Sequence, residues 1–173
     1  DEKQIADAGI LYLEGYLWDP ETPRYAMIRA IEVARAAGRK IAFTLSDTFC
    51  IDRHRDGFNQ LLDGGRIDIL FANEAEIIML TGASDCEQAI QMAEAKVDTL
   101  VVTRSEQGAV AAQNGARAQV PAEPVAKVVD TTGAGDLFAA GFLYGRTSGR
   151  SLEQSLQIGA IAQSSSLRRW VVG

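Results

Sequence analysis

The 173-residue chain has 23 acidic and 17 basic side chains and a net charge of −6, which argues against a nucleic-acid partner held through its phosphates. This length suits one domain, residues 1–173, with a single core. Cys50 and Cys86 lack metal-type spacing, no apolar run reaches the roughly 18 residues of a membrane helix, and no signal peptide opens the chain. Composition therefore predicts a soluble, cytoplasmic protein that binds neither nucleic acid nor membrane.

Runs rich in β-branched and aromatic residues predict strands, in chain order, at 10–18, 40–45, 67–72, 99–103, 108–113 and 126–129. Thr22-Pro23 opens a helix that ends at Gly38, and further helical segments are predicted at 56–62, 74–80 and 85–95. Asn114-Gly115 predicts the tight turn of a β-hairpin. This alternation indicates a parallel sheet with helices on both faces, whose ligands bind at the carboxyl ends of the strands.

The aromatic residues of the first strand and the single histidine have simple structural interpretations. Tyr12, Tyr16 and Trp18 lie in an apolar run and are predicted to be core residues. His54 lies in a charged segment and is predicted to lie on a solvated helix face.

The segment 128–142 runs from an extended apolar stretch through a glycine-rich turn into a helix-like segment. The first N–H groups of a helix have no internal partner and bind phosphate well. Glycines would let a ligand approach the main chain at Gly133, Ala134 and Gly135. Asp136, just inside the helix, could accept a proton from a nucleophile that attacks this phosphate. Local chemistry equally allows Asp136 to complement the helix dipole and cap the helix.

The sequence Asp130-Thr-Thr-Gly-Ala-Gly-Asp136, followed by Leu-Phe-Ala-Ala-Gly-Phe, resembles the C-terminal signature of the ribokinase-like sugar and nucleoside kinases of the phosphofructokinase B type. Asn73-Glu-Ala-Glu76 and Val101-Val-Thr-Arg-Ser-Glu-Gln-Gly-Ala109 agree with the family in order and spacing. The resemblance covers essentially the whole chain and implies an α/β fold, a three-layer αβα sandwich with a mostly parallel sheet. Because the chain begins at Asp1, without the acceptor-binding Gly-Gly motif and β-sheet lid of the family, it resembles the C-terminal, nucleotide-binding half of such a kinase.

The resemblance also implies catalytic roles. Asp136 would be the general base for the acceptor hydroxyl, and the amides of Gly133, Ala134 and Gly135 would form the anion hole for the transferred phosphoryl group. Asp130 would orient the site or hold a monovalent cation such as K⁺.

Binding of ATP and Mg²⁺ is implied in the same way. Asn73 and Glu76 would help to hold water on Mg²⁺, whereas a glutamate considered alone is usually a solvated helix carboxylate. Thr103, Ser105 and Gly108 would lie along the ATP phosphates and ribose. Ala160 would lie at the adenine pocket, where relatives often carry asparagine. The three residues before the hairpin could equally be plain turn residues.

Phe43-Thr-Leu-Ser-Asp-Thr-Phe49 is most similar to the adenosine kinase branch of the family. The function expected is an ATP-dependent kinase that phosphorylates a primary hydroxyl of a nucleoside, adenosine above all. Ribokinase or fructokinase activity on a sugar, and a catalytically silent nucleotide-binding module, are the alternatives. A dinucleotide-binding oxidoreductase is disfavoured, since the glycine signature does not open a first β-α-β unit. Exposed sheet edges make a homodimer a candidate assembly.

Overall fold

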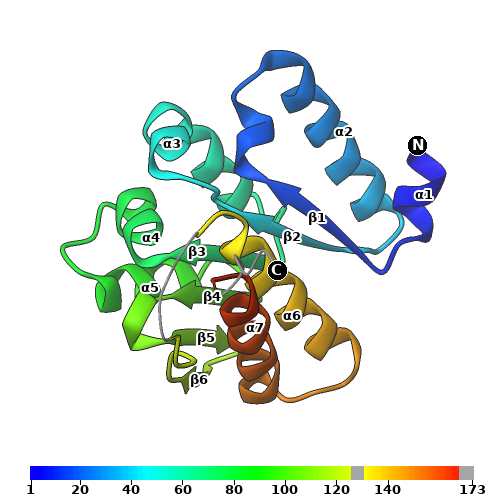
Figure 1. The fold of residues 1–173 in the computed structure, drawn as a ribbon. Coiled ribbons are helices and arrows are strands. Elements are labelled where there is room, and N and C mark those ends of the chain that lie inside the picture. The colour runs from blue at the N-terminus through cyan, green and yellow to red at the C-terminus, as the bar shows by residue number, and fades with distance from the viewer. Residues whose placement is uncertain (126–130, 168–173) are drawn as a thin grey trace, which may run out of the picture. The chain divides into compact units, whose positions relative to one another are not determined.

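The computed structural model describes residues 1–125 and 131–167, whose elements are drawn in Figure 1. In chain order they are α1 (Glu2–Asp7), β1 (Ile10–Glu14), the 3₁₀ turn η1 (Gly15–Trp18), α2 (Glu21–Ala36), β2 (Lys40–Thr44), α3 (Thr48–Asp63), β3 (Ile69–Asn73), α4 (Glu74–Thr81), α5 (Cys86–Glu94), β4 (Thr99–Thr103), the 3₁₀ turn η2 (Ser105–Gln107), β5 (Ala109–Gln113), β6 (Ala116–Val120), α6 (Ala134–Thr147) and α7 (Leu152–Leu167). Within the described residues, no helix has the length and apolar character needed to cross a membrane.

The strands form a six-stranded sheet in the order β1-β2-β3-β4-β5-β6. β1, β2 and β3 pair in parallel, with Ile10 opposite Lys40 and Ala42 opposite Ile69. β5 and β6 pair antiparallel, with Gln113 opposite Ala116. Helices connect the parallel strands because a parallel crossover needs a long connection, whereas a two-residue turn is enough for the hairpin. The sequence prediction of a mostly parallel sheet is confirmed.

The chain divides into two compact units, residues 1–102 and residues 103–173. The core of the first unit is built from the inward faces of β1 to β4 and their helices. Phe58 of α3 lies at its centre and makes edge-to-face contacts with Trp18 (5.8 Å between ring centroids) and Phe43 (5.3 Å). Such aromatic pairs add stabilisation beyond the burial of their apolar area. α3 is thereby fixed to β2 and to η1.

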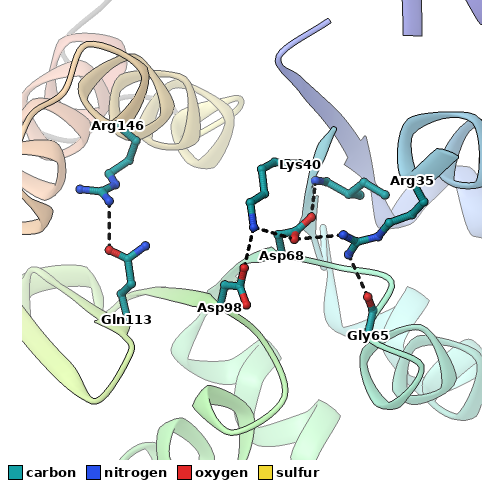
Figure 2. Close-up of polar contacts among 8 residues, drawn as sticks. Arg35, Lys40, Gly65, Asp68, Asp98, Gln113 and Arg146 are labelled. Atoms are coloured by element: carbon teal, nitrogen blue, oxygen red, sulfur yellow. Dashed lines mark hydrogen bonds and ion pairs between the residues drawn. The ribbon is translucent and has the colours of Figure 1, made fainter. Parts of the chain in front are cut away.

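The amino-terminal ends of β2 and β3 are joined through the buried carboxylate of Asp68 (Figure 2). Its Oδ1 accepts hydrogen bonds from the Arg35 guanidinium and the Lys40 ammonium, each at 3.1 Å. Its Oδ2 accepts from the main-chain N–H of Ile41 at 2.7 Å. Lys40 also pairs with Asp98, just before β4, at 2.7 Å. Asp68 therefore links the C-terminal end of α2 to the starts of neighbouring strands.

The second unit is formed by the β5–β6 hairpin and the α6–α7 helix pair. Asn114 and Gly115 both have positive φ, 51° and 78°, as a type I′ turn requires, so the predicted hairpin turn is confirmed. α7 packs on β5 and β6 and lies beside α6. Arg146, near the end of α6, donates a hydrogen bond to Gln113 at the end of β5 at 3.0 Å (Figure 2).

Four expectations about local structure were wrong. The first strand ends at Glu14, not at residue 18, because the chain turns so close to β2 that a Cβ on Gly15 would lie 2.4 Å from the carbonyl oxygen of Leu45. Tyr16 follows this turn and is 53% exposed, so it is not a core residue, although Trp18 is buried as predicted.

The second helix begins earlier than predicted. α3 starts at Thr48, where the side chain of Asp47 accepts the N–H of Cys50 at 2.7 Å, and it continues across a non-helical conformation at His54. His54 does not lie on an open solvated face, because its Nε2 lies 2.7 Å from the Asp19 carboxylate and its side chain is only 18% exposed. The predicted strand at 126–129 lies outside the described residues.

Candidate active site

The N-terminal turn of α6 carries the predicted catalytic residues. Gly133 is the residue that caps the helix, with φ of 71°, a conformation that glycine adopts readily. The N–H of Ala134 donates to Thr131 O at 3.1 Å, and the first bond within the helix runs from Leu137 N to Gly133 O. The N–H groups of Gly135 and Asp136 precede that first bond and point out of the helix end.

This helix end is sterically open. A Cβ placed on Gly133 or Gly135 would meet no atom within 4 Å, so neither glycine is required by packing against the described part of the chain. A Gly cap also leaves the first turn without the side-chain acceptor that serine, threonine or aspartate would supply. This open end is compatible with the anion site expected from the sequence, and that site stays a prediction.

The Asp136 carboxylate is exposed at this turn, and it makes no hydrogen bond or ion pair with the residues that the structure describes. Two residues further on, Phe138 is buried, as is Phe142 one turn later. The buried side of α6 thus anchors the helix while its first turn presents a carboxylate and main-chain amides to solvent. A negative charge at a helix N-terminus is stabilised by the dipole.

Thr103, Ser105 and Gly108 lie around η2, at the end of β4. The turn is closed by hydrogen bonds from Arg104 N to Gly108 O (2.7 Å) and from Gly108 N to Ser105 O (3.1 Å). Gly108 has φ of 83°, and a Cβ there would lie 2.0 Å from Val120 O. Glycine is thus required at 108 by the hairpin itself. The exposed side chain of Ser105 and the half-buried side chain of Thr103 are available for polar contacts.

Ala160 lies in α7 and is buried. The residue before it, Gly159, contacts Phe138 in α6, so the structure brings this part of α7 to the helix that carries Asp136. Asp130, the predicted cation or orienting residue, lies outside the described residues.

Asn73 and Glu76 form a capping box at the start of α4, in the first unit. Glu76 Oε2 accepts the main-chain N–H of Asn73 at 2.9 Å, Oε1 accepts Asn73 Nδ2 at 2.8 Å, and Asn73 Oδ1 accepts Glu76 N at 2.9 Å. Burial raises the pKa of Glu76, the Asn73 N–H acts against this, and the negative charge of Asp47 raises the pKa further. The pair therefore holds the start of α4 with a carboxyl group removed from solvent.

Both carboxyl oxygens of Glu76 already accept hydrogen bonds from Asn73, so the pair is not arranged to coordinate Mg²⁺ directly. The described residues contain no group of three or more His, Cys, Asp or Glu side chains that could hold a metal ion. Mg²⁺ commonly keeps several waters and is bound through one or two carboxylates together with substrate phosphates. A role for Glu76 toward Mg²⁺ would therefore act through water molecules on the ion, and it stays a prediction.

Sequence reasoning missed two exposed aromatic side chains in the first unit. Phe49, in the first turn of α3, is 75% exposed, and Tyr16 follows β1 directly. The hydroxyl of Tyr16 donates to Ser46 O at 3.5 Å, and Ser46 itself has φ of 74°, a strained value for a residue other than glycine.

The comparisons with known proteins agree with this fold. Residues 1–169 match the pfkB family carbohydrate kinases, and the chain belongs to that family. A cytidine kinase of Thermococcus kodakarensis is 33% identical over 141 residues, which are 79% of this chain and 50% of the relative.

Solved structures extend the likeness to the whole fold. A probable sugar kinase from Rhizobium etli has 43% identity and a TM-score of 0.94 over 98% of this chain and 51% of its own. The adenosine kinase from Sinorhizobium meliloti has 41% identity and a TM-score of 0.94, over 98% and 52%. A putative ribokinase II from E. coli, solved with ATP and Mg²⁺, has 26% identity and a TM-score of 0.88, over 98% and 56%. The predicted ribokinase-like α/β fold is confirmed, and the chain spans about half the length of these relatives.

Proposed function

We propose that the protein is an ATP-dependent kinase that transfers the γ-phosphoryl group of ATP to a primary hydroxyl of a small molecule. The observation that carries this proposal is the open, glycine-capped N-terminus of α6 with Asp136 exposed in its first turn. Asp136 takes the proton of the acceptor hydroxyl, whose oxygen forms a bond to the γ-phosphorus as the bond to ADP breaks. We assign stabilisation of charge on the transferred group to the amides at Gly133, Ala134 and Gly135, of which that of Ala134 donates to Thr131 O in this structure. Membership of the kinase family supports these roles.

The nucleotide would be held by Thr103, Ser105 and Gly108 on one side and by Ala160 on the other. Mg²⁺ neutralises charge on the phosphates when bound, and Glu76 with Asn73 would hold its water shell. The likeness to a ribokinase solved with ATP and Mg²⁺ supports this assignment. We assign Asp130 to orientation of the site or to a K⁺ ion on its position in the family signature.

We propose a nucleoside, adenosine first, as the acceptor. The exposed rings of Tyr16 and Phe49 offer flat apolar surfaces of the kind on which bases stack. The likeness to an adenosine kinase and a cytidine kinase supports the same choice. Ribose or fructose is the alternative acceptor, favoured by the likeness to a probable sugar kinase and a ribokinase.

Residues 1–173 would belong to one kinase domain in the cytoplasm, where the two buried cysteines stay reduced. The domain would act as a monomer or a homodimer. The competing function is a nucleotide-binding module without catalytic activity, because the motifs of this chain resemble those of the nucleotide-binding half of the family.

The test is acceptor-dependent ADP formation by the longest native form of the protein with adenosine, ribose and fructose. Asp136→Asn keeps the shape of the side chain but removes the base, so we expect turnover to fall by about 10² or more. Glu153→Gln is the matched control, since it removes an exposed carboxylate from the first turn of α7 and should leave turnover near wild type. ATP binding without turnover in the unsubstituted protein would establish the module instead.

A further inference from the structure

α6 and α7 pack closely against each other near Phe138, just after the first turn of α6. A Cβ added to Gly159 of α7 would lie 2.9 Å from the carbonyl oxygen of Phe138 and 3.2 Å from its ring. Phe138 is 1% exposed and lies two residues after Asp136. Helix propensity alone would favour alanine over glycine in the interior of α7. The glycine at 159 is therefore explained by the close approach of the two helices.

The same helix pair has a second close contact at its other end. A Cβ on Gly145, near the end of α6, would lie 2.7 Å from Ser155 Oγ and 2.8 Å from Ser155 Cα. Arg146, the next residue, is tied to Gln113 of β5. The two glycines thus carry comparable steric demands, Gly159 beside Phe138 near the start of α6 and Gly145 within the last turn of α6.

We propose that Gly159 is a positioning residue for phosphoryl transfer, which sets the place of the first turn of α6 relative to α7. This proposal rests on the role proposed for Asp136. Because Gly159 precedes Ala160, the residue assigned to the adenine side of the nucleotide, the same contact couples the part of α7 that would hold the base to the turn that would hold the phosphoryl group. A side chain at 159 must push Phe138 and, with it, the Asp136 carboxylate.

A side chain at position 159 should impair the catalytic step more than the binding of ATP. Reacting groups must be aligned closely, and a displacement of about 1 Å can cost 10²-fold in rate. Interactions made only in the transition state affect kcat, whereas uniform binding affects KM. A displaced Asp136 and displaced amides would therefore lower kcat while the KM for ATP changes much less.

The experiment compares Gly159→Ala with Gly145→Ala in the longest native form, at a temperature at which circular dichroism shows both to be folded. Both variants should lose thermal stability, because both place a Cβ against a neighbouring helix. We expect kcat to fall about 10- to 100-fold in Gly159→Ala with little change in the KM for ATP. Gly145→Ala should keep a kcat near wild type. Equal kcat values in the two variants would overturn the proposal.

A second pair of variants alters the same contact from the side of α6, and it can be used if a glycine variant does not fold. Phe138→Leu removes the ring that Gly159 contacts, whereas Phe142→Leu makes the same change one turn further along α6, at another fully buried position. Only Phe138→Leu should lower kcat, and equal effects would again contradict the role of Gly159. Asp136→Asn, measured beside them, separates the two proposals: if it retains full activity, the proposed catalytic function fails first.

Discussion

Glu76 shows how one sequence spacing can predict two roles that the sequence does not separate. The spacing of Asn73 and Glu76 is that of the family's metal-associated motif, and it is also that of a capping box. The capping hydrogen bonds could be predicted from this spacing alone. The raised pKa of the carboxyl group could not, because it depends on tertiary burial and on the charge of Asp47, which lies far away in the sequence. A buried carboxyl group of this kind makes stability depend on pH.

For Glu76 the pKa is raised above its ordinary value of 4.5, so the folded protein favours the protonated form. Its stabilising contribution is present in full below that ordinary value and is lost as pH rises through the raised pKa. Glu76→Gln cannot ionise and remains compatible with a capping box. We expect the free energy of unfolding of the wild type to decline relative to Glu76→Gln as pH rises from 4.5 to neutrality, measured by urea denaturation. A difference that stays constant over this range would contradict the prediction.

Among the elements, those with a local signal could be predicted and those determined by distant contacts could not. β4 has the predicted bounds because its apolar run is bounded by polar residues, and the β5–β6 turn follows from Asn114-Gly115. The end of β1 depends on the close approach of Gly15 to Leu45, which no local pattern indicates. α1 was not predicted, since it buries no residue and shows only a capping aspartate, Asp1.

Asp68, whose carboxylate links the starts of β2 and β3, leads to a prediction about the stability of the fold. Asp68→Asn retains an oxygen for Ile41 N but removes the charge shared by Arg35 and Lys40 (Figure 2). Because Asp68 is buried while both cations are partly solvated, we expect a loss of about 1–3 kcal/mol in the free energy of unfolding. Chemical denaturation measures this loss directly.

Asp98→Asn is the control for that experiment. It removes only the exposed pair between Asp98 and Lys40, whose side chains are 59% and 56% exposed, and should cost about 0–1 kcal/mol. Equal losses in the free energy of unfolding of the two variants would show that burial of Asp68 does not make its ion pairs more stabilising than the exposed pair.

At the scale of the whole molecule, the family and the fold could be predicted, since the glycine signature and two further motifs lie in one order over nearly the whole chain. The structure gives each motif its local geometry: the capping box in the first unit, and the η2 turn and the start of α6 in the second. The gathering of these motifs at one edge of the sheet stays a prediction. It depends on how residues far apart in sequence meet, which local patterns do not encode.

Burial is distributed unevenly over the molecule, and hydrogen exchange should reflect this. The middle residues of β2 and the residues of β4 up to Val102 are buried, whereas α1 buries none of its residues. We expect amides of β2 and β4 to exchange more slowly than those of α1 by a factor of at least about 1000, since local opening of α1 exposes no core. Hydrogen exchange followed by mass spectrometry checks this, and comparable protection of α1 would contradict it.

The Asn114-Gly115 turn has a practical use. A Cβ on Gly115 would meet no atom within 4 Å, and both turn residues are exposed. Exposed loop tips of this kind are the places where inserted sequence is tolerated best. A short affinity tag or a fluorescent reporter could therefore be placed between the two strands of the hairpin, leaving both chain termini unmodified and the first turn of α6 unaltered.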